Sequence, residues 1–142
     1  MSLLGDVKAA LEVNAPLMEL LPGGIYIHIS EISRQSAPNA FDANKEIVPC
    51  MLIKEGNEIP DGPYSRSVQT PLTIYFYQWI GFDVIEQVMD IVYDLLHEQR
   101  IGGNTWQILY TGRILDNRSG DVRDSALDCS MGVERFSATQ MK

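Results

Sequence analysis

Apolar residues recur along the chain in two periods, one typical of helices and the other of strands. Residues 3–21 carry apolar positions at helical spacing, which predicts a helix. This helix should break before Pro16, because the residue that precedes a proline is pushed out of the α region. β-branched and aromatic residues then predict two strands, at 25–29 and 47–54, on either side of a polar stretch.

The strand with the strongest pattern spans residues 72–80. Polar and apolar positions do not alternate within it, which predicts that both of its faces are covered. One face carries Leu72, Ile74, Phe76 and Ile80, and the other carries Tyr75, Tyr77 and Trp79. None of the other predicted elements is an evident cover for the three aromatic side chains. We therefore expect these three to contact a neighbouring subunit or a partner.

A long helix should follow this strand after Gly81. Asp83 is placed to cap its N-terminus, and Glu86 stands three residues later, as a capping box requires. The apolar face of the helix is broad, Arg100 lies at its far end, and the glycine pair at 102–103 should stop it. Residues 72–100 therefore predict a strand–helix unit built for packing.

Two more strands are predicted at 105–111 and 127–138, which completes the pattern. The fold class is α+β, with a mostly antiparallel, mixed β-sheet packed against one long α-helix and a short N-terminal helix. Residues 1–142 fit one domain, with long loops at about 30–46 and 112–126.

The charge balance restricts the possible partners. The chain has a formal net charge of −8 and a sequence pI of about 4.6, without clustered Lys and Arg to neutralise phosphates. We expect no specific nucleic-acid binding, whereas like charge would let DNA slide past such a surface. No apolar run approaches the ~20 residues that span a bilayer, so we expect no membrane partner. The first residues do not resemble a secretion signal, so we expect reduced cysteines at Cys50 and Cys129 in a cytosolic setting.

Candidate chemistry is sparse. The two histidines, His28 and His97, have neither a second histidine nor a cysteine pair at metal-ligand spacing. No G-x-S-x-G elbow occurs, and both glycine pairs are placed as turns and not as phosphate cradles. We expect no catalytic residue, no metal, no cofactor and no enzymatic activity. The alternative is a small cytosolic enzyme or ligand-binding domain with a pocket near Tyr26, His28 and Trp106.

Two charge patterns are candidate contact surfaces. Acidic residues recur at i,i+4 spacing along one side of the long helix, at Glu86, Asp90, Asp94 and Glu98. This acidic ladder is either a solvated face or a face that meets a basic partner or lines a DNA passage. Six of the eleven basic residues fall in predicted loops, namely Arg34, Lys45, Arg66, Arg113, Arg118 and Arg123. They are either ordinary exposed charges or protein–protein contacts.

The order of elements resembles a known family. A short N-terminal helix ends near Leu20-Leu21-Pro22-Gly23-Gly24-Ile25-Tyr26, and a long polar loop and a proline-containing strand follow. An aromatic strand then leads into an amphipathic helix over 72–100, and a tryptophan-bearing strand and a late strand close the chain. Along nearly all of its length this arrangement resembles the tail terminator (tail completion, or head–tail joining) proteins of long-tailed bacteriophages.

That resemblance implies a non-enzymatic structural protein. Members of the family form a ring, usually a hexamer, that binds the end of the finished tail tube and stops its polymerisation. The ring then presents a surface to the head connector, and DNA passes through it without specific binding. The implied location is the neck of the virion, after assembly in the host cytoplasm. Another head–tail connector or a tube-like protein remains the alternative within this class.

Overall fold

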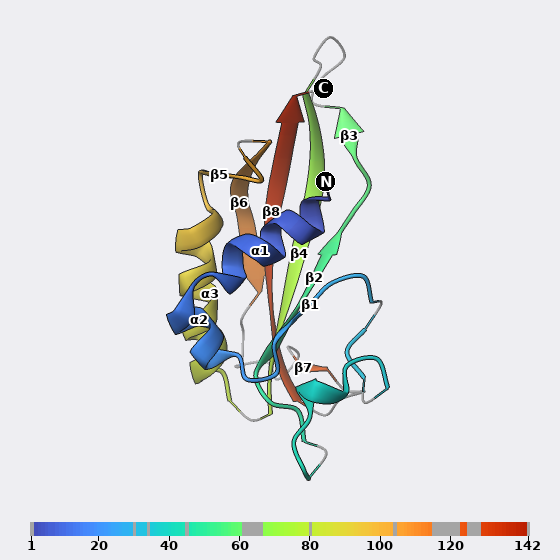
Figure 1. Ribbon diagram of the computed structural model, residues 1–142, viewed down its shortest axis with the longest axis vertical. Coiled ribbons are helices and arrows are strands. Elements are labelled where there is room, and N and C mark those ends of the chain that lie inside the picture. Colours follow the sequence, from blue (N-terminus) through green and yellow to red (C-terminus); the bar gives the residue numbers. More distant parts are fainter. Residues whose placement is uncertain are drawn as a thin grey trace.

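The computed structural model describes residues 2–29, 31–33, 35–44, 46–60, 67–79, 81–103, 105–114, 123–124 and 129–141, and shows an α+β fold. A twisted, mixed β-sheet forms its centre, and the α-helices lie on one face of it, whereas the 3-10 turn belongs to the cover of the opposite face (Figure 1). The helices are α1 (Leu3–Glu12), α2 (Ala15–Leu20), α3 (Asp83–Leu96) and the 3-10 turn η1 (Pro38–Ala40).

The sheet runs in the order β1-β2-β4-β8-β6-β5. Its strands are β1 (Ile25–Tyr26), β2 (Cys50–Glu55), β4 (Ser67–Gln78), β8 (Cys129–Met141), β6 (Trp106–Ile114) and β5 (Gln99–Ile101). Two further short strands, β3 (Ile59–Pro60) and β7 (Arg123–Asp124), pair with β4 and β8. Only β1 and β2 run parallel among these pairs, so the predicted mixed and mostly antiparallel sheet is confirmed.

The N-terminal helices form and break where the sequence predicts. The Ser2 hydroxyl accepts a hydrogen bond from the backbone N–H of Gly5 at 3.0 Å and caps α1. The Asn14 side chain accepts one from the N–H of Leu17 at 2.9 Å and caps α2. Pro16 sits in the first turn of α2, where a missing N–H costs no hydrogen bond.

The main hydrophobic core lies between the helices and the sheet. α1 crosses the strands obliquely, while α3 runs alongside the sheet (Figure 1). The two helices bury Leu3, Leu4, Val7, Leu11, Ile85, Val88, Met89, Val92 and Leu96. Burying each such side chain contributes about 1.5–3 kcal/mol. Three helices of 10, 6 and 14 residues thus form this layer, and the expectation of one long helix is wrong.

A second core covers the opposite face at one end of the sheet. Residues of the segment 31–47 bury Ile32, Ala37, Ala40 and Ile47 there. They pack with Cys50, Leu52, Tyr77 and Cys129, and with the partly buried Tyr75 and Trp79. The expectation that the chain lacks a cover for its aromatic face is therefore wrong. The predicted polar loop conceals apolar residues at irregular spacing, which the two regular periods do not reveal.

α3 begins differently from the prediction. Phe82 occupies the N-cap position and has no capping side chain. The Gln78 side-chain oxygen accepts hydrogen bonds from the N–H groups of Val84 and Ile85 at 3.0 and 3.1 Å. The Gln78 amide nitrogen donates to Asp83. The predicted cap by Asp83 is wrong, because the buried last residue of β4 satisfies the helix donors instead.

α3 also ends earlier than predicted. It stops at Leu96, and Glu98 adopts a left-handed conformation with φ of 59°. Arg100 therefore belongs to β5 and not to a helix. Gly102 and Gly103, with φ of 63° and 66°, form the turn between β5 and β6.

The strand predictions miss several boundaries. β1 is only two residues long, and His28, within the predicted strand, has a left-handed φ of 65°. β6 extends to Ile114, into the predicted loop at 112–126. β7 pairs with β8 inside the same predicted loop. Residues 115–122 and 125–126 of that loop lie outside the described part of the chain.

Candidate functional site

A buried glutamate lies near the middle of the sheet. Glu134 of β8 is opposite Ile74 of β4 and Arg113 of β6. Its side chain is 0% exposed, and neither carboxyl oxygen has a hydrogen-bond partner among the described residues. Buried polar groups are almost always hydrogen-bonded, so this carboxyl is an exception that indicates a functional site.

The register of the strands explains how Glu134 reaches the helix-covered face. Phe136 and Ala138 of β8 point into the main core, and Glu134 shares their face by the two-residue period of a strand. A β-bulge between Tyr110 and Gly112 shifts the pairing of β6 with β8. The shift puts Arg113, and not Gly112, opposite Glu134.

α3 and β6 border a partly open pocket above this carboxyl. The pocket has a volume of about 230 Å³ and is lined by Asp90, Tyr93, Tyr110, Arg113 and Glu134. A guanidinium nitrogen of Arg113 lies 3.2 Å from Oδ1 of Asp90 and so joins β6 to α3. Arg113 therefore pairs with the exposed Asp90 and not with the buried Glu134.

Aromatic rings form one wall of the pocket. The Tyr93 and Tyr110 rings meet edge to face at 5.0 Å between centroids. Tyr93 also stacks on His97 at 4.8 Å, and Tyr110 contacts Phe136 at 5.7 Å. The backbone N–H of Tyr110 donates to Nδ1 of His97 at 3.1 Å, which helps to hold this group of rings in place.

The electrostatics of the pocket follow from burial. Burial raises the pKa of Glu134 from 4.5 to about 8, a shift that the nearby Arg113 charge opposes and Asp90 reinforces. Burial also raises the pKa of Tyr110. At neutral pH the carboxyl is therefore mostly protonated. Ionisation of this buried carboxyl below about pH 8 is unfavourable, and a cation placed beside it would favour the charged form.

The acidic ladder is shorter than predicted. Glu86, Asp90 and Asp94 are exposed along α3, but Glu98 lies beyond the end of the helix. The predicted fourth step is therefore wrong, because the chain turns at Glu98 to enter β5. Asp90 is the ladder residue that lines the pocket.

The predicted basic contacts are placed only in part. Arg113 lies on β6 in the pocket, half exposed at 39% of its side-chain area. Arg34, Lys45, Arg66 and Arg118 lie outside the described residues. Arg123 is in β7, where its backbone pairs with Ser130.

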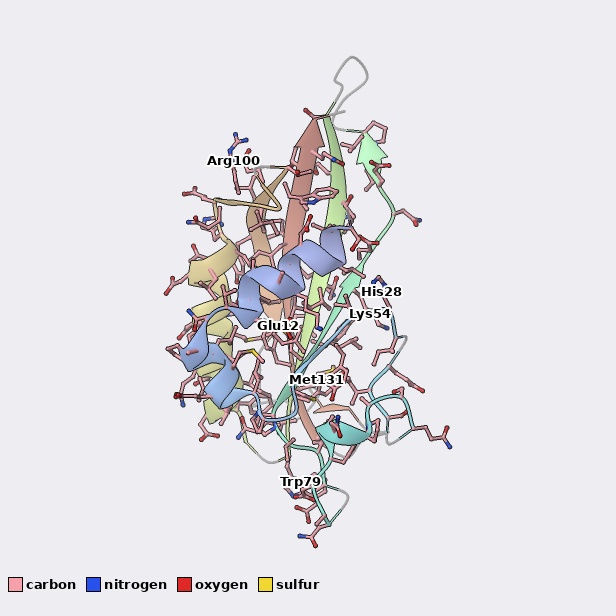
Figure 2. All side chains as sticks on the ribbon, in the orientation of Figure 1. Glu12, His28, Lys54, Trp79, Arg100 and Met131 are labelled. Atoms are coloured by element: carbon pink, nitrogen blue, oxygen red, sulfur yellow. The ribbon has the colours of Figure 1, made fainter. Side chains whose placement is uncertain are left out.

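The three predicted aromatic contacts lie on the face of the second core. Tyr77 is 5% exposed and belongs to that core. Tyr75 and Trp79 are half-buried against it, and Nζ of Lys54 lies 5.6 Å from the centroid of the Tyr75 ring. Figure 2 shows Trp79 near one end of the molecule and Arg100 toward the other. Their role in contacts with a partner stays a prediction.

The alternative pocket near Tyr26, His28 and Trp106 is wrong. Tyr26 packs against the second core, whereas Trp106 belongs to the main core on the opposite face of the sheet. The Trp106 ring N–H donates to Asp6 of α1 at 3.0 Å. The sheet therefore separates two of the three residues that this alternative requires.

Among the described residues, no three histidine, cysteine or acidic side chains gather to hold a metal ion. Cys50 and Cys129 are both buried in the second core, and burial raises the pKa of the Cys50 thiol. Such thiols are packing groups and not nucleophiles. Within the same part of the chain, no helix is long and apolar enough to cross a membrane.

The sequence carries a signal for Glu134 that lies outside any catalytic or metal-binding motif. Glu134 precedes Phe136 and Ala138 by two and four residues, so strand periodicity alone puts it on an apolar face. Tyr93 and Tyr110 carry no such signal, because their meeting depends on how α3 lies over β6.

No family model matches the sequence, and no curated protein matches it either. Among solved structures, the fold is similar to that of the gp17 protein of bacteriophage SPP1, with a TM-score of 0.50. The match covers 94% of this chain and 84% of the gp17 chain, and the two sequences are 12% identical over it. At this identity the two proteins share a fold, and no residue role is transferred.

Proposed function

We propose that this chain is a structural protein of a bacteriophage virion that acts at the neck, where the tail joins the head. The fold shared with a bacteriophage protein over 94% of the chain carries this proposal. The order of elements, which resembles the tail terminator family, supports it from the sequence. The proposed role is non-enzymatic and requires no cofactor.

The proposed assembly is a ring of identical subunits, with six as the expected number from the family resemblance. One surface for such contacts is the sheet face opposite the helices, beyond the second core. Leu109 and Ile114 of β6 lie on this face and are 40% and 43% exposed. Contiguous apolar surface marks contacts with other proteins, and a ring contact across this face would bury these two side chains.

The charge of the subunit suits a ring around DNA. With a net charge of −8, its acidic side chains repel phosphates and disfavour sticking. Glu86 and Asp94 on the exposed side of α3 are candidates for the lumen or for a basic partner. The proposed partners are the tail tube protein on one side and a head connector protein on the other.

Deletion of the gene in its phage or prophage tests the proposal. We expect full heads and unjoined tails of uncontrolled length in electron micrographs, with restoration when the protein is supplied in trans. Normal virions from the deletion strain would contradict a neck role. Unjoined tails of normal length would favour another head–tail connector over a tail terminator.

Native mass spectrometry of the purified protein tests the ring. We expect a closed oligomer, or a monomer that becomes a closed oligomer when tail tubes are added. A protein that stays monomeric when tail tubes are added would contradict the ring.

A further inference from the structure

Among the residues that line the pocket between α3 and β6, the carboxyl groups outnumber the cationic side chains. Glu134 and Asp90 supply two carboxyl groups, and Arg113 supplies one guanidinium that contacts Asp90. We propose that this pocket binds the guanidinium group of an arginine side chain presented by a second protein chain. The proposal rests on this geometry and stands whether or not the protein acts at a virion neck.

Glu134 is the central observation. A carboxyl that is 0% exposed normally has hydrogen-bond donors built around it, and both oxygens here lack them among the described residues. Its cross-strand neighbour Arg113 is the natural partner, but it reaches Asp90 on α3 instead. The other cross-strand neighbour, Ile74, offers no side-chain donor. Among the described residues, the structure therefore leaves this carboxyl open to a donor that enters through the pocket.

The shape of the pocket suits a flat cation. A volume of about 230 Å³ exceeds several times the ~30 Å³ share of one water molecule in the liquid. It has room for a guanidinium group and part of its aliphatic stem. The Tyr93 and Tyr110 rings form the wall beside the carboxyl, and a guanidinium gains energy against a tyrosine ring.

Arginine fits this site better than other cations. Its planar fork pairs with a carboxylate through two parallel hydrogen bonds and stacks on aromatic rings, and it is less strongly hydrated than a lysine ammonium. A metal ion is a poor alternative, because the described residues contain no group of three metal-ligating side chains.

Binding of the guanidinium should depend on pH, because it requires Glu134 to lose its proton. The groups that face it are Asp90 and Tyr93 from α3, and Tyr110 and Arg113 from β6. Burial raises the pKa of Glu134 to about 8, so an entering guanidinium must displace its proton. Affinity should therefore rise by roughly tenfold for each pH unit between about 6 and 8, and then level off.

Titration of the full-length protein with Nα-acetyl-arginine amide, followed by NMR, tests the proposal. We expect saturable shifts at Tyr110 and Arg113, with a dissociation constant in the millimolar range and the pH dependence described above. The citrulline analogue, which has the same shape without the charge, should bind at least tenfold more weakly. Glu134→Gln should weaken binding of the arginine probe at least tenfold at pH 8, while Asp94→Asn, an exposed acid outside the pocket, should leave it unchanged.

Three results would overturn the proposal. The first is the absence of saturable shifts at 50 mM probe and pH 8. The second is equal binding of the arginine and citrulline probes. The third, which needs no variant to fold, is an affinity of the wild-type protein that does not change between pH 6 and 8.

The same variants identify the source of the guanidinium. If a second copy of this chain supplies it, Glu134→Gln should weaken self-association in sedimentation velocity, and Asp94→Asn should not. If probe binding is present and self-association is the same in all three proteins, the arginine belongs to a different protein.

Discussion

Replacing Glu134 with glutamine should stabilise the protein at alkaline pH and change its stability little near pH 5. Glutamine has nearly the same shape as glutamate but cannot ionise. The side chain is 0% exposed, and its carboxyl oxygens lack hydrogen-bond partners among the described residues. The substitution therefore removes the cost of a buried negative charge without leaving a cavity.

The direction of this pH dependence follows from the pKa of Glu134 in the folded protein. Burial raises the pKa of Glu134 from 4.5 to about 8, so the folded protein keeps a proton that the unfolded chain releases within this interval. The free energy of unfolding then falls as pH rises. The stability associated with the protonated form is fully present below pH 4.5 and is lost by about pH 8.

The pKa change sets the size of the effect. At about 1.4 kcal/mol for each pH unit, a rise from 4.5 to about 8 corresponds to at most about 5 kcal/mol. Rotation of Arg113 toward the ionised carboxylate, and entry of water into the pocket, should reduce this cost. We therefore expect the glutamine variant to be about 2–3 kcal/mol more stable than wild type at pH 9.

Urea unfolding at pH 5, 7 and 9, followed by tryptophan fluorescence, measures this difference. Glu86→Gln, an exposed glutamate on α3, is the matched control and should show no comparable pH-dependent gain. A difference between wild type and Glu134→Gln that stays constant from pH 5 to 9 would refute the reasoning. So would a glutamine variant that is less stable than wild type at pH 9.

Two further predictions follow from α3. Gln78→Ala should destabilise the protein by about 1–2 kcal/mol in urea unfolding, because the N–H groups at the start of α3 lose their acceptor. The control Gln87→Ala, at an exposed position of α3, should lower the free energy of unfolding much less. Equal losses of stability in the two variants would contradict the capping role of Gln78. Reversing the exposed charges with Glu86→Lys and Asp94→Lys should prevent head–tail joining in a complementation assay while leaving the circular dichroism spectrum unchanged. Asp90 is left unchanged in this variant, because its carboxylate pairs with Arg113. Normal head–tail joining by the charge-reversed variant would show that the ladder is only a solvated face.

Residues 72–80 show what the local sequence pattern can predict. Their alternation predicts which side chains share a face, and the structure puts Leu72, Ile74 and Phe76 in the main core. Tyr75, Tyr77 and Trp79 pack on the opposite face, as predicted. This succeeds because successive side chains of a strand point to opposite sides whatever the rest of the chain does.

The start of α3 shows where local pattern fails. Asp83 and Glu86 have the types and spacing of a capping box, yet Gln78 accepts the hydrogen bonds of the first turn. The choice depends on the bend between β4 and α3, which aims the buried end of the strand at the helix N-terminus. The residue types at these positions do not reveal the direction of that bend.

The sequence by itself determined the periodic elements, the break before Pro16, the mixed and mostly antiparallel sheet and the acidic surface. Each of these depends on backbone sterics, side-chain period or composition within short stretches of chain. Only the tertiary structure decided that the segment 31–47 covers the aromatic face and that Arg113 pairs with Asp90 and leaves Glu134 alone. The pairing of Arg113 depends on a β-bulge and on the packing of α3 over β6. Both outcomes join residues more than twenty positions apart, over which no local period extends.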